Sequence, residues 1–193
     1  MSIVSTNWLD KNLENVKIID CSWHMPNVDR DPFKEYQAQH IKNAIFFDID
    51  KNSNPNSNLP HMLTDKNSWE KLVSLMGISN NDTIVIYDNS FLMSACRCWF
   101  QFIYYGHSPK LVHVLDGGFE KWKSENKKIS AEKTKIIKSK YYAKENKNMV
   151  KNKLEIKNNI ELFNAEQGSI PYIQWDSGDF YAKILIGGIG LER

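Results

Sequence analysis

The sequence has few arginines and no clustering of positive charge. Arg30, Arg97 and Arg193 are its only arginines, and its lysines are mixed with acidic residues and asparagines, so the formal net charge of the 193 residues is only +2. A surface that follows a phosphate backbone would be more clustered and richer in arginine. We therefore expect no nucleic-acid partner.

Cysteines and long apolar runs are also scarce. Three cysteines are too few and odd in number for a disulfide framework, which indicates a reducing compartment. No run is long and apolar enough to span a membrane, and residues 1–9 lack the basic and apolar regions of a secretory signal. We expect a cytoplasmic protein with no membrane partner.

Strand and helix signals alternate over the first 122 residues. Short β-branched or apolar runs predict strands at 16–20, 44–47, 83–87 and 111–115. Caps and helical spacing predict five helices. The first starts at Thr6, the second runs from Asp31–Pro32 to about His40, and the third runs from Ser68 to a cap at Gly77. The fourth covers Ser94–Tyr105, and the fifth follows Gly117–Gly118. This alternation predicts an α/β fold with a mostly parallel central sheet and helices on both faces.

The composition changes after Trp122. Residues 123–153 are mainly Lys, Asn, Glu and Ser, which suits an extended linker on a surface. A helix signal at 154–163 and a strand signal at 172–175 then weakly repeat the opening order of the chain. We expect a domain at 1–125, a linker at 126–153 and, since a domain needs about 100 residues, the incomplete start of a second domain at 154–193.

Five segments that match in order carry a resemblance to a known family. They are "VSTNWLDKNL…VKIIDCSW", "FKEYQAQHIKNAIFFDID", "LPHML", "VIYD…SACRCWF" and "VLDGGFEKWK". Together they resemble the tandem rhodanese-domain sulfurtransferases of the thiosulfate and 3-mercaptopyruvate type, and several motifs in order are more specific than one. The resemblance implies a rhodanese-like fold, sulfur transfer through a cysteine persulfide, a small sulfur donor, a thiophilic acceptor, and neither cofactor nor metal.

Asp88 stands at the end of the most strand-like segment of the chain. In α/β folds the turn after such a strand places ligands and nucleophiles, and a persulfide-forming thiolate would be stabilised there by backbone amides and a helix N-terminus. A carboxylate cannot form a persulfide. The resemblance implies that the N-terminal domain carries Asp here and that the working cysteine belongs to the matching loop of the C-terminal domain. Asp88 is therefore expected to occupy the nucleophile position and to be inactive.

Cys96 and Cys98 lie past this turn, inside the expected helix, where the loop amides do not cradle their thiols. The resembled family usually has proline at the first of these positions and a small apolar residue at the second. We expect both, and Cys21, to pack as small apolar residues. A Cys-x-Cys metal pair with His107 would lack further ligands.

Asp50 and His61 bracket a long polar loop, and loops of that length are often functional. The resemblance implies a supporting role: in the mercaptopyruvate-type enzymes the pair reaches across the domain interface and works with a serine of the catalytic loop in proton transfer. The alternative for this chain is that His61 hydrogen-bonds within its own loop and that Asp50 orders it.

The arginines of the first domain are not expected to bind substrate. Arg30 and Arg97 match family arginines and are expected to form structural ion pairs with carboxylates such as Asp20 or Glu35. The resemblance places the substrate-binding arginines in the second domain. There the family's Asp-Ala-Arg is replaced by residues 176–178, Asp-Ser-Gly.

The sequence thus predicts a truncated tandem rhodanese without sulfurtransferase activity of its own. Three alternatives stay open. The chain could be a working single-domain sulfurtransferase with a displaced cysteine, a non-catalytic rhodanese-like binding or regulatory module, or a half-enzyme complemented by a separate C-terminal rhodanese domain.

Overall fold

A five-stranded parallel sheet forms the centre of the domain. The computed structural model describes residues 2–158. The strands lie in the order β1 (Ser2–Val4), β6 (Val112–Leu115), β5 (Ile84–Tyr87), β2 (Lys17–Asp20) and β4 (Ala44–Phe46), and each neighbouring pair is parallel. The predicted α/β fold with a mostly parallel sheet is confirmed.

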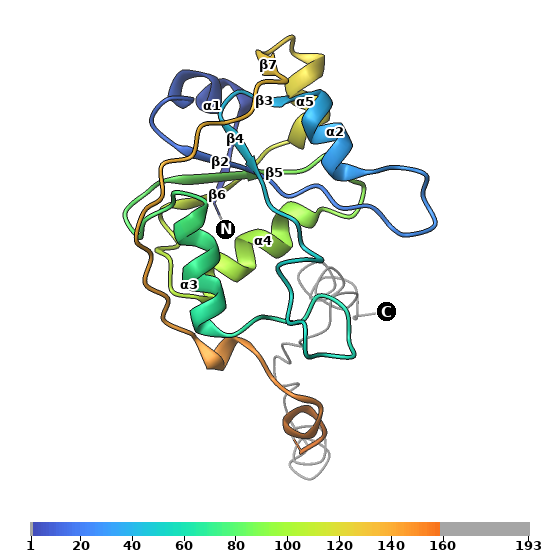
Figure 1. Cartoon of the computed structure of the whole chain (residues 1–193), viewed down its shortest axis with the longest axis vertical. Helices are drawn as coiled ribbons and strands as arrows, with labels where there is room; N and C mark the ends of the chain where they lie inside the picture. The colour runs from blue at the N-terminus through green and yellow to red at the C-terminus, as the bar shows by residue number, and fades with distance from the viewer. Residues whose placement is uncertain (1, 159–193) are drawn as a thin grey trace, which may run out of the picture.

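Helices cover both faces of this sheet, as predicted. They are α1 (Thr6–Asn12), α2 (Pro32–Ala38), α3 (Lys66–Leu75), α4 (Ser94–Tyr104) and α5 (Gly118–Ser124). Figure 1 shows α1, α2 and α5 on one side of the sheet and α3 and α4 on the other. The strands β2 and β5 are buried on both faces, and this explains their continuous apolar runs in the sequence.

Two apolar cores result, one on each side of the sheet. Alternate residues of β5 point to opposite sides: Ile84 and Ile86 join the core under α3 and α4, whereas Val85 and Tyr87 join the core under α1 and α5. The larger core contains Trp69, which stacks on Tyr105 with ring centroids 4.4 Å apart.

Several predicted element ends are wrong by one or two residues, and the caps explain why. Ser5, not Thr6, caps α1 by accepting a hydrogen bond from the Trp8 amide. α3 begins before Ser68 because the Asp65 side chain caps it. The Asp31–Pro32 start of α2 is confirmed.

A small second sheet was not predicted. α2 ends at Ala38 instead of about His40, because β3 (His40–Ile41) pairs antiparallel with β7 (Ile129–Ser130). The three-residue β1 was also missed. Both elements depend on partners far away in the sequence, and so no local pattern marks them.

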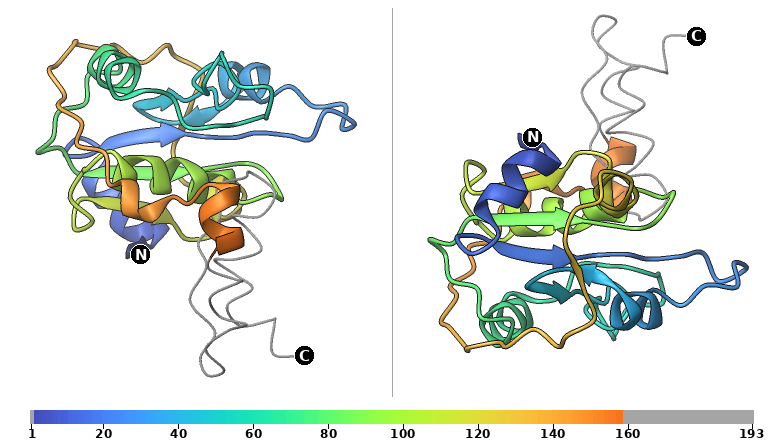
Figure 2. Two further views of the ribbon diagram at one scale, coloured as in Figure 1. Left: turned by 90° about the horizontal axis from the view of Figure 1, so that it is seen from below. Right: turned by 90° about the horizontal axis from the view of Figure 1, so that it is seen from above.

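Residues 131–146, which we call the strap, run without helix or strand along the outside of the domain from β7 to α3 (Figures 1 and 2). The Thr134 hydroxyl donates to the Ala44 carbonyl at 2.6 Å, and the Ser139 amide donates to the Ser74 carbonyl at 3.0 Å. Tyr141 is buried in the larger core. The strap is thus extended on the surface, and its middle is fastened to the domain, while the predicted linker at 126–153 stays a prediction.

The strap is followed by a 3-10 turn, Lys147–Met149, and by a helix that begins at residue 153. The predicted strand at 172–175 and the Asp-Ser-Gly at 176–178 lie outside the described residues. Over residues 2–158, no helix combines the length and the apolarity needed to cross a membrane.

Candidate active site

The candidate site lies at the carboxyl ends of β2, β4 and β5, where the loops that follow these strands meet. In parallel sheets this edge is where ligands bind. The loop after β5, residues 88–93, leads from Asp88 to the start of α4, as predicted.

Asp88 is fully engaged in holding this loop. Its Oδ2 atom accepts hydrogen bonds from the Ala95 amide at 2.7 Å and from the Ser94 hydroxyl at 3.2 Å. Met93 at the N-cap position has a left-handed backbone and no capping side chain, so Asp88 caps α4 in its place. Burial raises the pKa of Asp88, and the hydrogen bonds from Ala95 and Ser94 oppose this shift.

The backbone of Asp88 is also enclosed. Its carbonyl accepts a hydrogen bond from the Phe119 amide at 2.9 Å. Gly118 has φ +55°, and a Cβ atom there would lie 2.6 Å from the Asp88 carbonyl oxygen, so only glycine fits. Asp88 is therefore a structural cap, and its side chain carries no sulfur atom.

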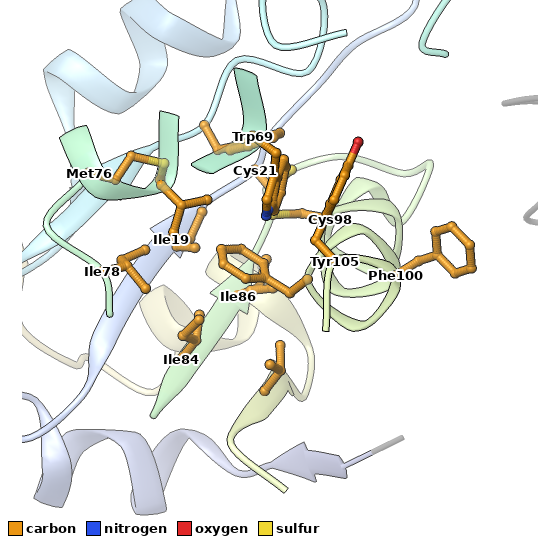
Figure 3. Packing of buried hydrophobic residues seen from close by; sticks show 14 of the residues in the cluster. Ile19, Cys21, Trp69, Met76, Ile78, Ile84, Ile86, Cys98, Phe100 and Tyr105 are labelled. Atoms are coloured by element: carbon orange, nitrogen blue, oxygen red, sulfur yellow. The ribbon is translucent and has the colours of Figure 1, made fainter. Parts of the chain in front are cut away.

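The three cysteines are free thiols, and each is buried or partly buried. Cys21 and Cys98 are fully buried in the larger core near Trp69 and Tyr105, as Figure 3 shows, so their predicted packing role is confirmed. Burial raises the pKa of Cys21, and the neighbouring Cys98 raises it further. Cys96 is only partly buried, and burial together with the Asp88 charge raises its pKa. Both environments disfavour the reactive thiolate.

Asp50 and His61 contact each other directly. His61 Nε2 lies 2.7 Å from Asp50 Oδ1, and because a carboxylate only accepts, Nε2 carries the proton of this bond. Asp50 Oδ2 accepts a second hydrogen bond from Trp23 Nε1 at 3.0 Å. The His61 side chain is 18% exposed and that of Asp50 is 64% exposed. The predicted hydrogen bond of His61 within its own loop is thus present.

One residue of α4 and one residue just after its end fasten the loop that carries His61. Arg97 of α4 donates from Nη2 to the His61 carbonyl at 2.5 Å, and the Tyr105 hydroxyl donates to the Thr64 carbonyl at 2.6 Å. His61 has φ +57°, a conformation that costs a non-glycine residue about 1–3 kcal/mol and persists only where neighbours impose it. This hydrogen bond of Arg97 goes to a backbone carbonyl, and its expected ion pair with a carboxylate stays a prediction.

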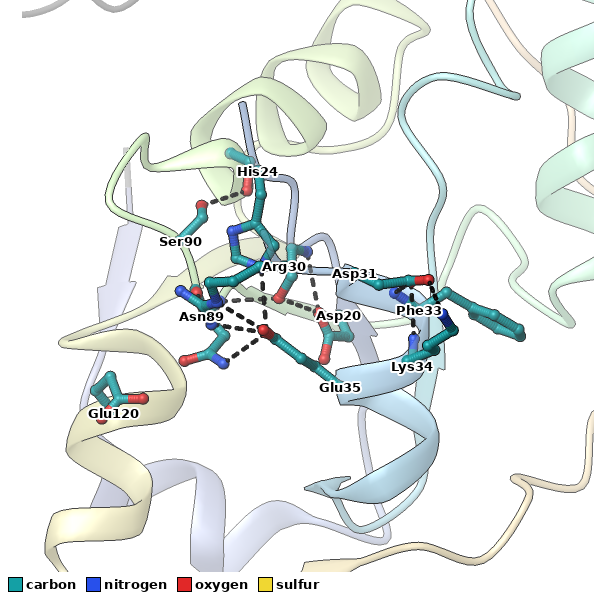
Figure 4. Close-up of polar contacts among 12 residues, drawn as sticks. Asp20, His24, Arg30, Asp31, Phe33, Lys34, Glu35, Asn89, Ser90 and Glu120 are labelled. Carbon is teal, nitrogen blue, oxygen red and sulfur yellow. Dashed lines mark hydrogen bonds and ion pairs between the residues drawn. The ribbon is translucent and has the colours of Figure 1, made fainter. Parts of the chain in front are cut away.

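Arg30 forms the predicted ion pair with Glu35, and this pair belongs to a network that includes Asn89, the residue after Asp88 (Figure 4). Two parallel hydrogen bonds of 2.6 and 2.7 Å join the guanidinium to the carboxylate. His24 Nε2 and Asn89 Nδ2 also contact Glu35 Oε2. Burial raises the pKa of Glu35, but the bonds from Arg30 and His24 outweigh it and hold the pKa below its usual value.

Asp20, at the end of β2, is bound to Ser22 instead of an arginine. Its Oδ1 atom accepts from the Ser22 amide at 3.0 Å and from the Ser22 hydroxyl at 2.6 Å. The same hydroxyl accepts from the Asn89 amide at 2.9 Å, so this pair also supports the Asp88 loop. Burial raises the pKa of Asp20 to about 6.

The sequence predicts Asp50, His61 and Asp88 as site residues, and their roles stay predictions, but it does not predict the contacts that position them. Trp23, Arg97 and Ser22 reach the site from other elements, and only the folded arrangement brings them there. Within residues 2–158, His, Cys, Asp and Glu side chains form no group of three or more suited to a metal ion.

These features define an α/β domain with a parallel central sheet and a buried carboxylate, that of Asp88, in the loop between β5 and α4. Residues 5–125 match the rhodanese-like domain family, and the chain therefore belongs to this family. Its rhodanese domain is of the thiosulfate/3-mercaptopyruvate sulfurtransferase type, so the predicted resemblance is confirmed.

Two curated relatives illustrate the match. The chain is 43% identical over 124 residues to thiosulfate/3-mercaptopyruvate sulfurtransferase 1, mitochondrial, of Arabidopsis thaliana. The aligned residues cover 63% of this chain and 32% of the relative. It is 33% identical over 168 residues to 3-mercaptopyruvate sulfurtransferase of Rattus norvegicus, and these residues cover 83% of this chain and 56% of the relative. The chain thus spans between about a third and just over half of the length of these relatives.

The fold is similar to that of a solved 3-mercaptopyruvate sulfurtransferase. The crystal structure of SseA from Escherichia coli matches with a TM-score of 0.76 and 26% identity, over 86% of this chain and 63% of the other. The cytoplasmic location stays a prediction, and the Arabidopsis relative is mitochondrial by name.

Proposed function

We propose that this chain is the non-catalytic rhodanese half of a thiosulfate/3-mercaptopyruvate-type sulfurtransferase, and that a second rhodanese domain supplies the persulfide-forming cysteine. The observation that carries the proposal is Asp88. Asp88 takes the place that a nucleophilic cysteine would have, and a carboxylate cannot form a persulfide. The Asp88 carboxylate instead caps α4 by accepting hydrogen bonds from Ala95 and Ser94. The buried thiols of Cys21 and Cys98 offer no substitute.

The proposed substrates follow from the curated relatives. A small sulfur donor, thiosulfate or 3-mercaptopyruvate, would pass its outer sulfur to the cysteine of the second domain, and a thiophilic acceptor would remove it. No cofactor enters this scheme. The proposed division is a domain at 1–125, a linker at 126–153 and the beginning of a second rhodanese domain from 154 onward.

The proposed contribution of this half to the chemistry is proton transfer by Asp50 and His61. When a thiolate attacks the sulfur of 3-mercaptopyruvate, the electron pair of the broken C–S bond stays on the pyruvate enolate, which must take up a proton. His61 has Nε2 bonded to Asp50, so its Nδ1 is the ring nitrogen left to exchange a proton. Asp50 would orient the ring and stabilise its protonated form.

A chimera tests this proposal. Residues 1–158 replace the corresponding N-terminal half of the rat enzyme, and pyruvate release from 3-mercaptopyruvate is measured. We expect an active chimera in which His61→Ala and Asp50→Asn lower kcat by about 100-fold or more, as for a lost general acid–base group. Asp88→Asn serves as the matched control and should leave kcat unchanged.

The other outcomes point to different functions. Full activity of the chimera with Asp50→Asn and His61→Ala would exclude the proton-transfer role and favour a binding or regulatory module. The exposed apolar loop residue Phe91, which is 97% exposed, would suit such a module. Sulfur transfer by the unmodified chain alone would contradict the proposal as a whole.

A further inference from the structure

We infer that Arg97 is a positioning residue that holds His61 in the conformation in which its ring meets Asp50. The inference rests on the proposed function, because it gives Arg97 a purpose only if the Asp50–His61 pair has one. It starts from the backbone of His61, which is left-handed at φ +57° although the residue carries a side chain. Such a conformation persists where the surroundings impose it.

Arg97 is the residue that imposes it most directly. Its Nη2 atom donates to the carbonyl of His61 itself at 2.5 Å, and charge-assisted bonds of this kind are the stronger ones. The guanidinium also lies 5.8 Å from the centroid of the Phe100 ring on the same helix, which restricts its direction. The Arg97 side chain is therefore held by Phe100 on its own helix and by the His61 carbonyl in the loop.

The fixed backbone sets the ring of His61 between two partners. Its Nε2 atom is 2.7 Å from Asp50, and its ring meets the Trp23 ring edge-on with centroids 4.8 Å apart. Asp50 in turn accepts from Trp23 Nε1, so the three side chains close a small cycle at the surface. A relaxed His61 backbone would swing the ring out of this cycle.

Arg97 also sets the spacing between two parts of the site. It lies on α4, the helix whose first turn is capped by Asp88, and so the same rigid element carries the nucleophile-position loop and the anchor of His61. Tyr105, next to the end of α4, fastens the same loop at Thr64 but does not contact His61 in the described bonds. This makes Tyr105→Phe a matched control for loop anchoring alone.

Nuclear magnetic resonance on the full chain tests the inference without any activity measurement. The readouts are the His61 Nε2–H signal and the nuclear Overhauser effect between the His61 and Trp23 rings. The indole N–H signal of Trp122, which donates to the Lys128 carbonyl, reports whether the domain stays folded. Arg97→Met should abolish both His61 readouts and keep the Trp122 signal, whereas Arg97→Lys should partly restore them and Tyr105→Phe should keep them.

The inference is overturned if Arg97→Met keeps both His61 readouts in a folded chain, or if Tyr105→Phe abolishes them equally. Should Arg97→Met lose the Trp122 signal, Arg97→Gln decides in its place, because glutamine is polar but too short to reach His61. Failure of the proposed function would show differently. The kcat of the chimera would then be unchanged by Asp50→Asn and His61→Ala, while the His61 ring contacts of the full chain would still depend on Arg97.

Discussion

At the scale of single residues, Asp88 replaces a missing cap. The first turn of α4 has no capping side chain at Met93, and the Asp88 carboxylate accepts the hydrogen bonds of Ala95 and Ser94 instead. A cysteine thiol is a weak acceptor and would satisfy these donors less well. The position therefore favours structure over sulfur chemistry in this domain.

We predict that Asp88→Ala lowers the free energy of unfolding by about 1–2 kcal/mol, the usual loss for a helix cap. Asp88→Asn should lower it by less than about 1 kcal/mol, because the amide oxygen of asparagine still accepts these hydrogen bonds. Asparagine also carries no charge, and so the burial that raises the pKa of Asp88 no longer destabilises this side chain. Urea unfolding of the three proteins measures both values. Equal stability of wild type and Asp88→Ala would refute the capping role.

Asp20 gives a prediction on pH. Burial raises its pKa to about 6 in the folded state, from about 3.9 in an unfolded chain, so the folded state binds more protons between these values. Its contribution to stability is therefore complete below about pH 4 and is lost as the pH rises through about 6, by up to roughly 3 kcal/mol.

Asp20→Asn should remove this decline. Compared with wild type, the variant should gain about 2–3 kcal/mol between about pH 4 and pH 7, because the amide stays neutral throughout. Chemical unfolding at a series of pH values measures the difference. A constant difference between the two proteins would show that the carboxyl titrates at its ordinary pKa.

At the scale of elements, locally coded features could be predicted and paired ones could not. The start of α2 is encoded within three residues, Asp31 to Phe33, and was predicted correctly. The β3–β7 pairing joins His40 to Ser130, and neither segment shows a strand pattern of its own. The same contrast holds in the site. The place of Asp88 at the end of a strand can be predicted from the strand pattern alone, whereas the contact of Arg97 with His61 depends on how α4 packs against the rest of the domain.

The strap supplies the prediction at this scale. Tyr141 is 2% exposed and stacks on His107 at 5.8 Å, while its neighbour Tyr142 is 60% exposed. Tyr141→Ala should lower the free energy of unfolding by about 3–5 kcal/mol, and Tyr142→Ala should change it by less than about 1 kcal/mol. Thermal and urea unfolding compare the two. Similar small losses would mean that the strap is only a linker.

At the scale of the whole molecule, the described part is a folded rhodanese domain, and the proposed function gives it a second domain as its partner. Of the proposed proton-transfer pair, Asp50 is 64% exposed and His61 is 18% exposed, and the Asp88 carboxylate is bound to the start of α4. Such an arrangement suits a domain that completes another's site. Several motifs in order carried the resemblance to the family in the sequence, whereas the burial of each cysteine depends on how distant elements pack.

The most direct test of this account is mass spectrometry of the purified chain after incubation with thiosulfate or 3-mercaptopyruvate. We predict that Cys21, Cys96 and Cys98 gain no sulfur, while the cysteine of a catalytic rhodanese domain treated in parallel gains one sulfur atom. A persulfide mapped to any of the three, with release of sulfite or pyruvate, would contradict the claim that this domain is non-catalytic.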